Sequence, residues 1–87
     1  MRKKPATKKI APDKETALLL TTLGQKLTDL RKKRGYKNYE KFAYEHDLPR
    51  AQYGRYEKGQ DLRLSSLNKV LKALGITLKD FFGEGFE

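Results

Sequence analysis

Helical spacing of the apolar residues is the feature that most restricts the fold of this sequence. Apolar side chains recur three or four positions apart wherever they cluster, and no segment shows the two-residue alternation of a strand. Asp13 can cap the start of the longest such segment, and Gly35 can stop it. The pattern therefore predicts an all-α fold that opens with a helix over residues 14–34. One side of that helix carries Thr16, Leu19, Leu20, Leu23, Leu27 and Leu30.

Two shorter helical segments follow, and each is bounded by residues that start or stop helices. Asn38 can cap the second helix, which we expect to end near Asp47. Pro49 suits the start of a third helix, and Gly59 suits its end. The spacing of the tyrosines in this third helix predicts that Tyr53 and Tyr56 face the core.

The last two helices are predicted from a second leucine-rich stripe and a final cap. A loop at 60–63 leads to the fourth helix, which Gly75 closes, and Thr77 caps a short fifth helix over Leu78–Phe82. The expected inward side of the fourth helix consists of Leu64, Leu67, Val70, Leu71 and Leu74. A chain of 87 residues has room for one small domain. We expect a flexible basic arm at 1–12, the domain at 13–83 and a tail at 84–87.

Charge and composition exclude several classes of function. Lys and Arg total 20 against 11 Asp and Glu, which gives a net charge of +9 and favours a polyanionic partner, with nucleic acid ahead of anionic lipid. The absence of cysteine and the single histidine argue against disulfides, metal sites and catalytic triads, so we expect no enzyme, cofactor or metal. No apolar run approaches a membrane span or a secretory signal. The sequence predicts a soluble, cytoplasmic, non-catalytic chain.

The segment from Ala43 to Gly59 carries the functional information. Ala43 is small enough for two helices to cross closely, and Asp47 tolerates the left-handed conformation that a tight turn needs. Leu48 follows Ala43 by five positions, and Tyr53 follows Leu48 by five. These residues in this order predict a helix-turn-helix.

Together with the flanking helices, this segment resembles the Cro/C1-type, or XRE-type, helix-turn-helix family of transcriptional regulators. The resemblance covers about residues 20–82 and implies a compact five-helix bundle of the phage-repressor DNA-binding type. It also implies that the third helix lies in the DNA major groove while the second crosses the phosphate backbone. The chain departs from the family pattern at Tyr39, where Gln is usual, and at Asp47, where Gly is usual. The matching residues are Leu23-Gly24, Leu27, Leu30-Arg31, Phe42-Ala43, Leu48, Tyr53, Arg55-Tyr56-Glu57-Lys58-Gly59, Leu67 and Leu74-Gly75-Ile76.

The residues expected to contact DNA lie on the side of the third helix away from Tyr53 and Tyr56. Arginine pairs with guanine through two hydrogen bonds, and a small residue lets the backbone approach. The expected base-reading residues are Arg50, Ala51, Gln52 and Arg55. The expected phosphate contacts are Asn38, Tyr39, Gly54, Lys58 and Arg63.

A structural ion pair is expected between the first and third helices. Family members often join the positions of Arg31 and Glu57, and a carboxylate on the inner shoulder of a helix needs a partner such as a guanidinium. Such a pair would hold the DNA-reading helix at its angle.

These observations predict a sequence-specific double-stranded DNA-binding regulator, such as a repressor, that acts as a homodimer on an inverted repeat. One helix contacts too few bases for strong selectivity, so a second copy is expected. The candidate dimer surface is Leu18, Phe81 or Phe82, or Phe86. The alternative is an antitoxin-like interaction protein that binds a partner protein as well as DNA. Binding to a membrane surface is disfavoured, because the first helix needs its leucines for the core.

Overall fold

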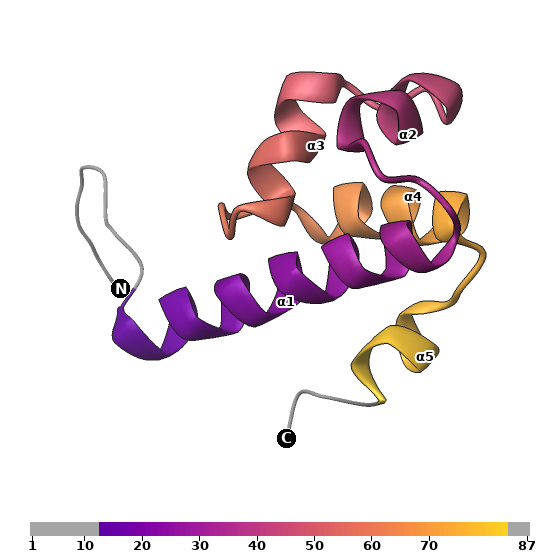
Figure 1. Ribbon diagram of the computed structural model, residues 1–87. Coiled ribbons are helices and arrows are strands. Elements are labelled where there is room, and N and C mark those ends of the chain that lie inside the picture. Colours follow the sequence, from indigo (N-terminus) through magenta and orange to yellow (C-terminus); the bar gives the residue numbers. More distant parts are fainter. Residues whose placement is uncertain (1–12, 84–87) are drawn as a thin grey trace.

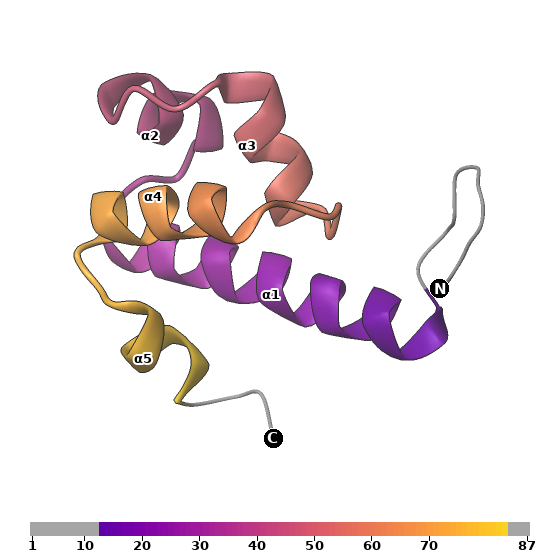
Figure 2. The same ribbon diagram turned by 180° about the vertical axis from the view of Figure 1, so that it is seen from behind.

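All secondary structure in the part of the chain that the computed structural model describes, residues 13–83, is helical. The helices are α1 (Lys14–Lys33), α2 (Tyr39–Glu45), α3 (Arg50–Glu57), α4 (Leu64–Leu74) and α5 (Leu78–Phe82). Figure 1 shows α2 and α3 above α1 and α5 below it, and Figure 2 shows α4 alongside α1 on the reverse side. The predicted all-α class with five helices is confirmed. The expected arm at 1–12 and tail at 84–87 lie outside the described residues.

Three of the helices begin at side-chain caps that the sequence predicts. The Asp13 carboxylate accepts a hydrogen bond from the backbone N–H of Thr16 at 2.7 Å. The Asn38 side-chain oxygen accepts from the N–H of Glu40 at 2.7 Å, and the Thr77 hydroxyl accepts from the N–H of Asp80 at 3.1 Å. These contacts satisfy amides that a helix leaves without partners in its first turn, which is why the helices start at these residues.

The turn between α2 and α3 depends on a left-handed residue. Asp47 has φ 59°, the only positive φ of a non-glycine residue in 13–83. This conformation lets the N–H of Leu48 reach back to the carbonyl oxygen of Ala43 at 2.8 Å. The chain therefore leaves α2 abruptly and begins α3 after Pro49.

The core lies where the other four helices meet the C-terminal two thirds of α1. Its largest fully buried side chains are Tyr53 of α3, Phe42 of α2 and Phe81 of α5. The centre of the Phe42 ring lies 5.3 Å from that of Tyr53, so these two helices share one aromatic cluster. The other buried apolar residues are Leu20, Leu23, Leu27, Ala43, Leu48, Tyr56, Leu67, Val70, Leu71 and Leu74.

Two leucines that the sequence places on core-facing stripes are exposed. Leu19 of α1 is half exposed, and Leu64, the first residue of α4, is 64% exposed. The N-terminal part of α1 extends past the other helices, so its stripe has nothing to pack against there (Figures 1 and 2). The spacing of apolar residues identifies which side of a helix faces the core. It does not show how much of the helix length the neighbouring helices cover. Leu18, predicted to lie off the stripe, is 65% exposed.

Candidate nucleic-acid interface

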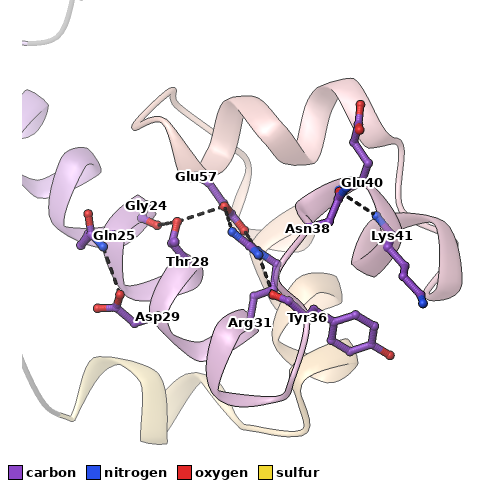
Figure 3. Close-up of polar contacts among 10 residues, drawn as sticks. All are labelled: Gly24, Gln25, Thr28, Asp29, Arg31, Tyr36, Asn38, Glu40, Lys41 and Glu57. Carbon is purple, nitrogen blue, oxygen red and sulfur yellow. Dashed lines mark hydrogen bonds and ion pairs between the residues drawn. The ribbon is translucent and has the colours of Figure 1, made fainter.

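A buried ion pair joins α3 to α1. The Arg31 Nε donates to Glu57 Oε2 at 2.8 Å, and Arg31 Nη2 donates to Glu57 Oε1 at 3.0 Å (Figure 3). The two side chains are only 5% and 8% exposed. Two parallel hydrogen bonds fix distance and orientation together. The pair expected from the sequence is thus present, and it sets the angle at which α3 crosses α1.

Further hydrogen bonds extend this pair on both sides. Arg31 Nη1 donates to the carbonyl oxygen of Tyr36 at 2.6 Å, which ties the turn after α1 to the same guanidinium. The Thr28 hydroxyl lies 3.0 Å from Glu57 Oε1 and 3.0 Å from the carbonyl oxygen of Gly24. The hydrogen bond to Glu57 raises the pKa of Arg31, so the guanidinium stays charged. No sequence pattern pointed to Thr28 separately.

Gly24 allows the two helices to meet at backbone distance. A Cβ placed there would lie 2.6 Å from the carbonyl oxygen of Glu57 and 2.7 Å from that of Tyr56. Both atoms are backbone and cannot move aside without shifting α3. The glycine and the ion pair therefore act on the same end of α3.

The Tyr53 hydroxyl is buried beside the ion pair. The phenol side chain is fully buried, and its hydroxyl has no hydrogen-bond partner among the described residues. Burial raises the pKa of this hydroxyl, and the neighbouring Glu57 carboxylate raises it further. Tyr53 thus contributes its ring to the core while its hydroxyl carries a desolvation cost.

α2 is seated on α3 through the ring of Tyr39. A Cβ at Gly54 would lie 2.6 Å from Tyr39 Cε1 and 3.1 Å from the Tyr39 hydroxyl oxygen. Gly54 is buried, so its expected place on the exposed side of α3 is wrong. The residue is small because a tyrosine ring covers it.

The other candidate DNA-contacting residues of α3 are exposed. They are Arg50, Ala51, Gln52, Arg55 and Lys58. The acidic residue of α3, Glu57, is withdrawn into its pair with Arg31. The exposed side of this helix consequently presents cationic and uncharged groups alone.

The candidates divide between two grooves that flank α3. Gln52 and Arg55 line a polar cleft together with Arg63, which lies just before α4. Arg50 lines a separate groove at the turn before α3, with Tyr44 and Glu45 of α2 and with Asp47. The structure thus brings together Gln52, Arg55 and Arg63 and separates them from Arg50.

Gln60 also lines the polar cleft, and sequence reasoning missed it. Its backbone N–H donates to the carbonyl oxygen of Arg55 at 3.0 Å, which fixes the turn that follows α3. Gly59, with φ 92°, makes this return of the chain possible. The available signal was its position immediately after the glycine that ends α3.

The remaining two phosphate candidates lie at helix starts. The side-chain oxygen of Asn38 is occupied by the first-turn amides of α2, which leaves its amide nitrogen as the group available to an outside acceptor. Arg63 precedes α4, whose first turn has no side-chain cap, so the guanidinium stands beside unsatisfied N–H groups. Both residues are exposed.

Residues 13–83 contain no group of three side chains suited to hold a metal ion. None of the helices in this range has the length and apolar character needed to cross a membrane. No protein-family model, curated protein or solved structure matches the chain.

Proposed function

We propose that this chain is a sequence-specific regulator that binds double-stranded DNA, with α2 and α3 forming a helix-turn-helix and α3 lying in the major groove. The observation that supports the proposal most strongly is that α3 has one side buried against α1 and one exposed cationic side. One side is fixed to α1 by a buried ion pair, and the other exposes two arginines and a lysine without an acidic residue. A rigidly held helix with this surface suits a polyanion that has a groove of helix width.

The exposed chemistry of α3 matches the edges of base pairs. Arg55 can give two hydrogen bonds to guanine O6 and N7, and Gln52 can pair with adenine N6 and N7. Ala51 can contact a thymine methyl group. Arg50 is the fourth residue that the sequence assigns to bases. All four side chains are exposed and are held on the helix that the ion pair orients.

Phosphate contacts would surround this surface. Lys58 ends α3, Arg63 precedes α4, and Asn38 and Tyr39 begin α2. Such contacts set the register of a protein on DNA but do not read sequence. They also make affinity fall as the salt concentration rises, because each neutralised phosphate releases counterions.

Selection from a random pool of duplexes at near-physiological salt tests the proposed function. We expect enrichment of one motif repeated in inverted orientation, with half-site centres about 34 Å apart. Lys79→Ala is the matched control, because Lys79 is an exposed cation of α5, on the opposite side of α1 from α3 (Figure 1). This variant should select the same motif, whereas Arg55→Ala should lose one base preference in each half-site. A pool that emerges without any motif contradicts the proposal.

A second candidate function is an antitoxin-like interaction protein that binds a partner protein besides DNA. The exposed leucines at the N-terminal end of α1, Leu18 and Leu19, favour a protein contact of some kind. The number of chains bound to a selected inverted repeat discriminates between a second copy of this chain and another protein as the partner of these leucines. Two chains per duplex assign these leucines to a second copy, and one chain at saturation leaves them for another protein.

A further inference from the structure

We propose that Phe86 packs onto α1 of its own chain, in an open groove beside Leu19 and Thr22. The occupant of this groove is thus the segment 84–87, which follows the end of α5 in the sequence. This docking does not depend on DNA binding. It concerns an apolar surface of α1 that no described helix covers.

The groove runs along the exposed side of α1. Thr22, Lys26 and Leu30, which are four positions apart, line its length, and its surface is mainly apolar. Leu19 belongs to the same side of the helix, because it is three positions before Thr22 and seven before Lys26. The groove therefore continues onto the half-exposed leucine at the start of α1.

Leu19 shows that the apolar stripe of α1 extends beyond the helices packed on it. It precedes Leu23 by four positions and Leu27 by eight, and both of these leucines are buried. Leu19 itself is 48% exposed. Covering it would remove apolar surface from water, which is favourable by ~25 cal/mol per Å². The first large apolar residue of the sequence after α5 is Phe86.

The chain runs back along α1 toward this leucine as it passes from α4 through α5. Arg34 Nη1 donates to the carbonyl oxygen of Leu74 at 2.8 Å, and Lys26 Nζ donates to that of Phe81 at 2.7 Å. The chain thus moves from the C-terminal end of α1 to its middle, and Figure 1 shows α5 below α1. Gly83 lines a second groove that shares Lys26 with the first. The segment after Gly83 therefore begins next to the α1 groove.

The distance from Gly83 to Leu19 is within reach of Phe86. An extended chain spans ~3.3–3.6 Å per residue, so the step from Gly83 to Phe86 covers about 10 Å. The helix rise from Lys26 back to Leu19 is also about 10 Å. So short a tether gives Phe86 a high effective concentration at the groove, which favours its own chain over a second copy.

The charges of the segment and of the groove are complementary. Glu84 and Glu87 lie on either side of Phe86 and bring two negative charges. Two copies of α1 placed groove to groove would instead bring the same lysines together and repel. An acidic segment with one aromatic ring is thus the better occupant. The charged residues among the described lining are Lys26, Lys32, Lys33 and Asp29.

A double-mutant cycle in the full chain tests this docking. Phe86→Ala and Leu19→Ala should each lower the equilibrium constant for folding by roughly three- to tenfold, because each removes apolar surface from the contact. The double variant should lose less than the product of the two factors. Leu18→Ala is the matched control, since Leu18 is an exposed leucine of the same helical turn that lies off the stripe. Its effect should combine with that of Phe86→Ala without coupling.

NMR contacts between the Phe86 ring and the Leu19 methyl groups identify the occupant. In a mixture of isotope-labelled and unlabelled chains, these contacts should arise within one chain and persist on dilution. Contacts between chains would assign the groove to the segment of a second copy and overturn the proposal. Absence of the contact, or strictly independent losses in the cycle, overturns it as well. Neither experiment contains DNA, so such a failure is distinct from failure of the proposed function.

Discussion

Among single residues, Glu57 is the one on which the orientation of α3 depends. Both of its carboxylate oxygens receive hydrogen bonds from Arg31, and Thr28 contacts one of them. Removing either partner leaves a charge in a nearly buried position. Breaking this pair should therefore lower stability more than breaking a surface ion pair, which contributes little.

We therefore predict that Glu57→Ala and Arg31→Ala each lower the free energy of unfolding by about 1–4 kcal/mol. The double variant should lose less than the sum, since each single variant already breaks the pair. Chemical denaturation of the four proteins measures this coupling. Strictly additive losses would show that the two residues do not interact in solution.

At Tyr53, by contrast, we predict that a conservative substitution does not lower the stability of the protein. Its buried hydroxyl lacks a hydrogen-bond partner among the described residues, so Tyr53→Phe removes a desolvated polar group and keeps the ring. We expect unchanged or higher stability, by up to about 1–3 kcal/mol. Tyr36→Phe is the control, because the Tyr36 hydroxyl donates to Glu45 at 2.8 Å. A clear loss of stability in Tyr53→Phe would reveal a partner for this hydroxyl.

We also predict that the Tyr53 hydroxyl makes the stability of the protein depend on pH in the alkaline range. The folded state raises the pKa of its hydroxyl, so the group stays protonated after the hydroxyl of the unfolded chain has begun to ionise near its ordinary pKa of 10.0. Because only the unfolded chain ionises at that pH, the stability of the folded state falls as the pH rises further. Tyr53→Phe should flatten this decline in thermal melts above pH 10, whereas an unaltered decline would assign it to other groups.

Turning to the helices, α1 begins with two turns that no other helix covers. All residues from Asp13 to Leu19 are exposed, so these turns depend on local interactions. The Asp13 cap is the principal one, and its hydrogen bonds with Thr16 lower the pKa of the carboxylate below its ordinary value of 3.8. A lowered pKa means that the cap stabilises the helix above that pH and is lost as the pH falls through the folded value.

Acid titration of α1 followed by NMR should show this loss at the start of the helix. As the pH falls through the lowered pKa of Asp13, the amide of Thr16 should lose its cap and the first turn should fray. Asp13→Asn keeps a capping side chain without a titrating group, so its first turn should stay unchanged over the same range. Equal fraying in both proteins would mean that the carboxylate does not control this end.

Element boundaries could be predicted from the sequence because their causes are local. Asp13, Asn38 and Thr77 cap helices, and Asp47 adopts the left-handed conformation expected in the turn. These features depend on residues within one turn of the chain. The ends of α1 and α2 accordingly fall within one or two residues of the predicted positions.

Contacts between helices could be predicted only in part. The ion pair between Arg31 and Glu57 could be predicted, because the family resemblance implies it and because a buried carboxylate needs a partner. The placement of Gly54 under Tyr39 did not follow, because it depends on how α2 crosses α3 in space. The same limit explains why Leu19 and Leu64 are exposed. Both have the spacing of core residues, but no partner helix covers them.

At the scale of the whole molecule, association of two chains depends on which apolar residues remain exposed. Phe81 is fully buried in the core, so it is excluded from the expected dimer surface, whereas Phe82 is 41% exposed. Phe86 lies outside the described residues. Leu18 and Phe82 are thus the described candidates for contact with a second copy. Repulsion between two chains of +9 opposes that contact until DNA neutralises them.

We therefore predict a chain that sediments as a monomer alone and as two copies per duplex on an inverted repeat. Leu18→Ala and Phe82→Ala should lower the cooperativity of DNA binding without changing affinity for a single half-site. Leu64→Ala is the control, an exposed leucine on another helix. A complex of one chain on the full repeat at saturating protein would show that the domain works singly.

Removing one hydrogen-bond acceptor from the major groove measures whether α3 reads base edges there. Replacing guanine by 7-deazaguanine in a selected duplex deletes the N7 atom and keeps base pairing. At one position of each half-site, the unsubstituted chain should lose about fivefold to hundredfold in affinity, because a good arginine–guanine pair contributes ~1–3 kcal/mol. Arg55→Ala should bind both duplexes alike. Equal binding of the two duplexes by the unsubstituted chain at every guanine position would show that α3 does not read guanine in the major groove.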